Sequence, residues 1–153
     1  MKIKILTFGK LKESFYKEAE AEYLKRFGRD FSVEALELSQ ARFDDPLKNK
    51  ATEAKEYFKK IPRGAFKIVL DEKGKQFTSE GLAKNIQTLQ TSGNSTLIFA
   101  IGGAFGWDKS VIDDADLVLS LSKFTFPHQL ARVVLVEQLY RAHMIIKGSS
   151  YHK

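Results

Sequence analysis

The chain has 153 residues, a length typical of one domain, and carries a formal net charge of +6 at pH 7. It contains no cysteine, which excludes a disulfide framework, a thiolate nucleophile and every cysteine-ligated metal site. No stretch approaches the roughly 20 apolar residues of a membrane span, and the lysine-interrupted N-terminus does not resemble a signal peptide, so we expect one soluble, cytoplasmic domain over residues 1–153.

The first half of the chain alternates predicted strands and helices. Residues 2–8 alternate polar and apolar side chains and predict a first strand, and residues 31–38 predict a second. Between these strands, apolar residues at helical spacing predict a helix over 11–27. A charged helix is expected over about 46–60, because Pro62 cannot continue it.

The second half is more apolar. Residues 66–70 predict a third strand, and Asp71-Glu72-Lys73-Gly74 predicts a turn after it. Thr78 or Ser79 is expected to cap a helix that extends to about residue 90. Residues 96–101 form a nearly continuous apolar run, which is typical of a strand covered on both faces.

The last predicted elements complete an α/β pattern. Asp108 can cap a short helix, residues 116–121 predict a fifth strand, and a final helix is expected over 127–147 with Pro127 in its first turn. Strands that alternate with helices predict a mostly parallel sheet with helices on both faces.

Ligands bind such sheets at the carboxyl ends of the strands, so the loops after Leu70, Ile101 and Leu121 are the expected binding region. The glycines of I-G-G-A-F-G at 101–106 would let the backbone approach a ligand, or could merely shape a turn. The loop L-S-K-F-T-F-P-H at 121–128 could wrap an adenine ring, or its phenylalanines could fill the core. Neither a P-loop nor the standard dinucleotide-binding glycine pattern occurs, and the spacing of the histidines argues against a metal site.

Basic and titratable residues are concentrated at the C-terminal end. Residues 123–153 contain five lysines or arginines, one acidic residue and all three histidines. A basic balance favours a polyanion such as nucleic acid. The terminal Tyr151-His152-Lys153 could stack on a base, move a proton and contact phosphate, although chain ends are more often frayed and inert.

Several motifs in this order resemble the RlmH family of SPOUT-class ribosomal RNA large-subunit pseudouridine N3-methyltransferases. They are K-I-x-I-L-x-x-G-K-L-K at the start, I-G-G-x-x-G at 101–106, L-S-x-x-T-F-P-H at 121–128, R-V-V-L-V-E-Q-x-Y-R-A at 132–142 and the terminal Y-H-K. The resemblance implies an α/β-knot with a C-terminal trefoil knot, a homodimer, and S-adenosylmethionine as methyl donor. The implied reaction is methylation of N3 of a pseudouridine in 23S ribosomal RNA on assembled ribosomes.

The resemblance also implies site residues. His152 would help to remove the imide proton, Arg141 would stabilise negative charge on the carbonyl oxygens, and Tyr151 would orient the base or the tail, with Lys153 as a basic neighbour. For Arg141 the alternative is a simple helix ion pair with Glu137. No metal is implied. The implied cofactor contacts are Leu70, Gly102, Leu121, Ser122, Lys123, Phe124, Thr125 and Phe126.

Two other functions stay open at this point. One is a SPOUT enzyme that acts on a different RNA site, such as a ribose 2′-hydroxyl in tRNA. The other is an RNA-binding or ribosome-assembly module that has lost catalysis. The motifs at the strand ends favour an enzyme over the module, and the Y-H-K ending favours the pseudouridine substrate.

Overall fold

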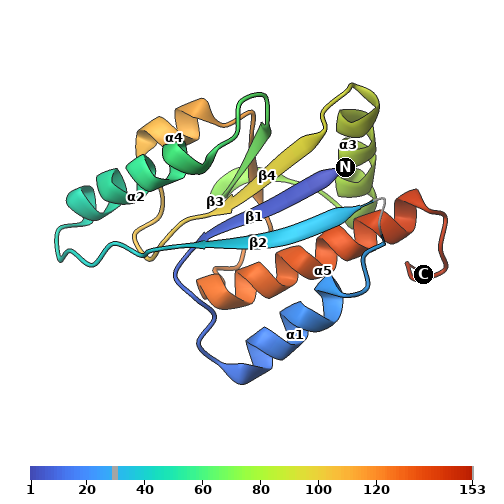
Figure 1. Cartoon of the computed structure of the whole chain (residues 1–153), viewed down its shortest axis with the longest axis horizontal. Helices are drawn as coiled ribbons and strands as arrows, with labels where there is room; N and C mark the ends of the chain where they lie inside the picture. Colours follow the sequence, from blue (N-terminus) through green and yellow to red (C-terminus); the bar gives the residue numbers. More distant parts are fainter. Residues whose placement is uncertain (29–30, 153) are drawn as a thin grey trace.

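The computed structural model describes residues 1–28 and 31–152, and within these residues the chain forms a five-stranded sheet (Figure 1). All pairings are parallel and the strand order is β2-β1-β4-β3-β5. The strands are β1 Lys2–Phe8, β2 Ser32–Leu38, β3 Phe66–Gln76, β4 Thr96–Ile101 and β5 Leu117–Ser120. The helices are α1 Ser14–Leu24, α2 Pro46–Lys60, α3 Ser79–Thr91, α4 Lys109–Asp114 and α5 His128–Ile146.

Helices cover both faces of the sheet, as the alternating pattern predicts (Figure 1). In β1, Ile5 belongs to the core under α1, α3 and α5, whereas its neighbour Leu6 belongs to the core under α2 and α4. The central strand β4 is buried on both sides, with Phe99 in the first core and Ile98 in the second. Burial of each such side chain stabilises the folded chain by about 1.5–3 kcal/mol.

Most predicted boundaries are confirmed. Thr78 caps α3 by accepting a hydrogen bond from the Gly81 amide, and Asp108 caps α4 through the Ser110 amide. The first helix is shorter than predicted, because Leu11 is buried in the preceding loop and the Lys12 amide donates to the side chain of Gln129. Pro127 is the N-cap residue of α5 and does not lie in its first turn.

The predicted turn at 71–74 is wrong. β3 continues to Gln76, and Leu119 of β5 pairs with both Leu70 and Lys75 across a register shift. A Cβ atom on Gly74 would lie 2.6–2.8 Å from backbone atoms of β5, so glycine alone allows this approach. Pairing with a distant strand therefore outweighs the local preference for a turn.

A buried ionic cluster attaches the first half of α5 to the rest of the fold. Arg132 is 5% exposed, and its guanidinium donates to Glu20 of α1 and to Glu37 of β2, each at 2.7 Å. A further contact joins it to Thr7 of β1 at 3.3 Å. Burial alone would lower the pKa of Arg132, but its hydrogen bonds to the two carboxylates raise it, so the residue stays charged.

Replacement of Arg132 by alanine should destabilise the fold by about 3–5 kcal/mol, because Glu20 is left as a buried, unpaired charge. Urea unfolding measures this loss. The matched control is Arg26→Ala, which removes a solvent-exposed pair with Glu22 and should leave the unfolding midpoint close to that of the parent chain. Equal midpoints for the two variants would contradict a stabilising role for the buried cluster.

Candidate functional site

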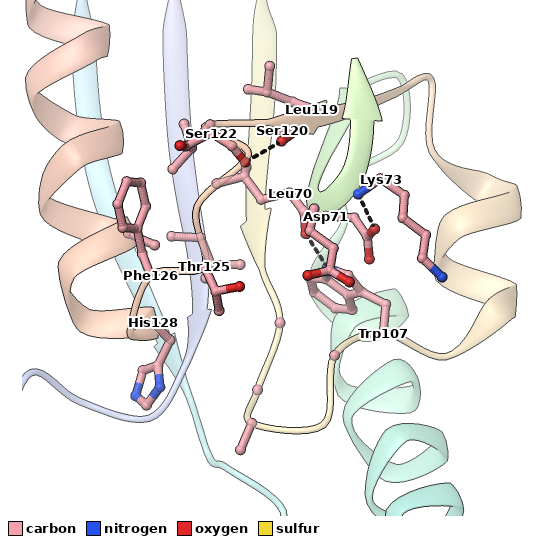
Figure 2. A pocket seen from close by; sticks show the side chains of 18 of the residues that line it. Leu70, Asp71, Lys73, Trp107, Leu119, Ser120, Ser122, Thr125, Phe126 and His128 are labelled. Carbon is pink, nitrogen blue, oxygen red and sulfur yellow. Dashed lines mark hydrogen bonds between the residues drawn. The ribbon is translucent and has the colours of Figure 1, made fainter. Parts of the chain in front are cut away.

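A cavity of about 570 Å³ opens at the carboxyl edge of the sheet (Figure 2). Its walls come from residues 70–73 within β3, the ends of β4 and β5 with the loops that follow them, and the first turn of α5. The volume suits a small organic ligand. The three segments picked out from the sequence, after Leu70, Ile101 and Leu121, therefore meet around one space, although the first of them belongs to β3 and is not a loop. Of the expected cofactor contacts, the lining includes Leu70, Gly102, Leu121, Ser122, Phe124, Thr125 and Phe126, but not Lys123.

Trp107 joins two of these walls. Its indole Nε1–H donates to the carbonyl oxygen of Leu70 at 2.9 Å, as Figure 2 shows. A Cβ atom on Gly102 would lie 3.1–3.3 Å from the indole ring, so the loop after β4 lies flat against it. Phe8 and Tyr57 contact the ring edge-on from the core below. Sequence reasoning missed this residue, and its only signal was that it is the single tryptophan of the chain.

The loop after β5 forms the opposite wall and is shaped by its own hydroxyl groups. Ser120 Oγ donates to the carbonyl oxygen of Ser122 at 3.0 Å, and Ser122 Oγ accepts from the Phe124 amide at 2.9 Å. Phe124 is 83% exposed, so it does not fill the core. The loop thus presents backbone groups and an aromatic ring to the cavity, which suits a flat heteroaromatic ligand.

The rim of the cavity carries charges of both signs. Lys50 of α2 and the segment Asp71-Glu72-Lys73 line it, and the carboxylate of Asp71 accepts a hydrogen bond from the Lys73 amide at 2.9 Å (Figure 2). His128 lines it at the start of α5. Among the residues that the structure describes, no group of His, Asp or Glu side chains is arranged to hold a metal ion.

The expected catalytic residues form a second cluster, made by Arg141 in the C-terminal part of α5 and by Tyr151 and His152 after the helix. Arg141 donates to Glu137 at 2.7 Å, and its guanidinium carbon lies 4.9 Å from the ring centre of Tyr151. Its Nη1 atom lies 3.4 Å from Nδ1 of His152. The structure therefore brings Arg141, Tyr151 and His152 together, and the ion pair with Glu137 exists beside them.

His152 is held by Glu80, which sequence reasoning missed. Nε2 of His152 lies 2.6 Å from a carboxylate oxygen of Glu80, at the start of α3. The pKa of Glu80 is lowered to about 2, first by hydrogen bonding to its own backbone amide and then by His152. The segment after α5, residues 147–152, is called the tail below. It is packed against the start of α3 through His152. Lys153 lies outside the described residues.

The two clusters lie at opposite ends of α5. The cavity is lined by His128 and Ala131 in the first turn, and Arg141 is ten residues further along. At about 1.5 Å per residue this is about 15 Å along the helix axis. Figure 1 shows the chain leaving α5 at the end opposite to the one at which the helix begins. Within one chain, the expected cofactor and catalytic residues do not form one site.

No helix in the described ranges is long and apolar enough to cross a membrane.

Comparison with known proteins identifies the family. A family profile described as "Predicted SPOUT methyltransferase" matches residues 1–152. Proteins named "Ribosomal RNA large subunit methyltransferase H" are 45% identical in Ruminiclostridium cellulolyticum, 45% in Halothermothrix orenii and 41% in Acetivibrio thermocellus. In each case the match covers 100% of both chains. The chain therefore belongs to the SPOUT methyltransferase family.

Proposed function

We propose that this protein is a cytoplasmic, S-adenosylmethionine-dependent enzyme that methylates N3 of a pseudouridine in 23S ribosomal RNA on assembled ribosomes. The observation that carries the proposal is the convergence of the segments after Leu70, Ile101 and Leu121 on one cavity in a member of a methyltransferase family. The names of the full-length relatives support the large-subunit ribosomal RNA as substrate.

The cavity residues fit this methyl donor. Backbone groups and apolar side chains around Leu121 and Phe126 would hold the adenine, and Gly102 would allow close approach of the ligand to the backbone. The rim charges of Lys50 and Asp71 complement the carboxylate and ammonium of an amino-acid moiety. Bound S-adenosylmethionine supplies a sulfonium methyl group that is already activated, so the chain's own task is alignment and charge stabilisation.

The tail would prepare the acceptor base. An imide N3–H is a poor nucleophile until its proton is removed. Because a carboxylate accepts hydrogen bonds, Glu80 would favour the His152 tautomer with its proton on Nε2, so that Nδ1 carries the lone pair. The base would displace the long contact of Arg141 Nη1 with Nδ1, at 3.4 Å, and Nδ1 would then take the imide proton. Arg141, beside Nδ1, would stabilise the negative charge that develops on the carbonyl oxygens. Tyr151 would orient the base.

We further propose a homodimer in which the tail of one subunit completes the cavity of the other. The separation of the two clusters along α5 supports this arrangement, since neither cluster alone can align donor and acceptor. Specificity would come from the shape of the assembled ribosome and from phosphate contacts of the basic C-terminal region.

Titration with S-adenosylmethionine should change the fluorescence of Trp107 in a saturable way, because the ring lies in the cavity wall. Calorimetry should show binding weakened at least about tenfold, or about 1.4 kcal/mol, in Thr125→Tyr, whose larger side chain occupies the cavity. Thr91→Tyr at the exposed end of α3 is the control and should bind normally. Absence of saturable binding by the parent chain would favour a non-catalytic RNA-binding module.

Ribosomes from cells that lack this protein should accept labelled methyl groups, and nucleoside mass spectrometry should identify N3-methylpseudouridine. Protein-free ribosomal RNA should be a poor substrate, and binding to ribosomes should weaken as salt is raised. His152→Ala should lower the rate about 10²–10⁴-fold through loss of the general base. A methylated ribose or a tRNA product would instead identify a different SPOUT activity.

Mixed dimers test whether the site is shared between subunits. Thr125→Tyr has an obstructed cavity and His152→Ala has a defective tail, so each homodimer should have strongly reduced activity at a donor concentration well below the Kd of Thr125→Tyr. A co-expressed heterodimer should regain activity, because one of its two sites combines an intact cavity with an intact tail. Failure to regain activity in a verified heterodimer would show that the cavity and tail of the same chain work together.

A further inference from the structure

Helix α2 carries a buried carboxylate beneath the loop that follows β4. Glu53 is 3% exposed and lies beside Ala54 and one turn before Tyr57, two residues of the apolar core. The described part of the chain offers it no cationic partner within ion-pair distance. A buried carboxylate without an ion pair is costly, so its hydrogen-bond partners decide what it does.

Those partners are backbone amides of two loops at the carboxyl edge of the sheet. The Ala41 amide, in the loop after β2, donates to Oε1 at 3.3 Å. Gly103, in the loop after β4, lies directly against the carboxylate, and its backbone amide acts on it as well. Burial raises the pKa of Glu53, and the two backbone amides partly oppose that increase.

Gly103 lies so close to the carboxylate that a larger residue does not fit. A Cβ atom there would lie 2.5–2.8 Å from the carboxylate atoms of Glu53. The preceding Gly102 lies against the indole ring of Trp107, with its own hypothetical Cβ 3.1–3.3 Å from that ring. The two glycines are therefore held between a carboxylate on α2 and an aromatic ring, and both of them line the cavity although Glu53 does not.

We infer that Glu53 is a positioning residue for methyl-donor binding: its carboxylate fixes the backbone of Gly102 and Gly103 where the donor must approach. The inference rests on the proposed function of the cavity. An apolar side chain at this position would leave two loop amides without a partner, and the loop would lose its fixed place. Asn49, one turn earlier, uses its side-chain oxygen in the same way on the Phe43 amide at 3.1 Å, so α2 presents a row of acceptors to these loops.

Glu53→Gln is the first test, because it keeps the shape but replaces one acceptor oxygen with an NH₂ group that faces backbone donors. Calorimetry should show S-adenosylmethionine binding about ten- to hundredfold weaker, since a displacement of the loop by about 1 Å is enough for such a loss. KM for the donor should rise to match, whereas kcat at saturating donor and KM for ribosomes should stay within about twofold of the parent values.

Glu56→Gln is the matched control. It makes the same chemical change one turn away on α2, at a partly exposed residue whose carboxylate forms an ion pair with Lys59. Its donor affinity should equal that of the parent chain. Circular dichroism and thermal unfolding establish that each variant is folded before binding is compared.

A second test uses the close contact itself. Gly103→Ala should weaken donor binding, because the added methyl group collides with the Glu53 carboxylate and displaces the loop. In the double variant Gly103→Ala/Glu53→Asp the carboxylate is drawn back by one methylene group, so binding should recover by about tenfold relative to Gly103→Ala. A general loss of stability would make the two substitutions additive and would show no recovery.

The outcomes separate this inference from the proposed function. If the parent chain binds the donor and folded Glu53→Gln binds it equally well, Glu53 is not a positioning residue. Additive losses in the double variant, or a fall in kcat at unchanged donor KM, would overturn the inference too. If the parent chain itself fails to bind S-adenosylmethionine, the proposed function is the part that fails.

Discussion

The buried contact between Arg132 and the carboxylates of Glu20 and Glu37 determines where α5 lies. One guanidinium connects this helix to α1, β1 and β2, and the helix cannot shift without separating charges away from water. The first turn of α5 lines the cavity, and its last turns carry the tail cluster. The same ionic contact therefore fixes the position of both parts of the proposed site.

The cavity is built mainly from backbone, and its shape depends on side chains that hold that backbone from behind. Trp107 holds β3 at Leu70, the serine hydroxyls hold the loop after β5, and Glu53 holds the loop after β4. This arrangement explains why glycines occur at the lining positions: their small size lets the supporting groups reach the main chain. Activity can therefore depend on residues that never touch the ligand.

Much of the fold could be predicted from the sequence, because its signals are local. Alternation of side chains located β1, and the capping residues Thr78 and Asp108 located the starts of α3 and α4. The error at residues 71–74 arose because Leu70 and Lys75, on either side of this turn-like sequence, both pair with Leu119 of β5, more than 40 positions away. The turn preference of these four residues alone cannot show that strand pairing with β5 will outweigh it.

In the candidate site, too, local sequence signals located some residues, whereas residues that act through distant contacts were missed. Motifs located the cavity loops and the tail residues, since each is a contiguous stretch of the chain. Glu53 and Glu80 were missed because each acts on a segment far away in sequence, Gly103 and His152 respectively. One signal was present for Glu53: it is a carboxylate on the same helix face as Ala54 and Tyr57, where an apolar residue is expected.

The geometry of the tail argues against a site formed within one chain. From Ala131 to the end of α5 at Ile146 is about 22 Å along the axis, and six further residues lead to His152. Fully extended, those six residues would span only about 20 Å. The tail instead folds back, with His152 on Glu80 and Tyr151 against Tyr140. The proposed homodimer removes this conflict, because a twofold interface is reciprocal: each tail would reach the cavity of the other chain and keep its own contacts with Glu80 and Tyr140.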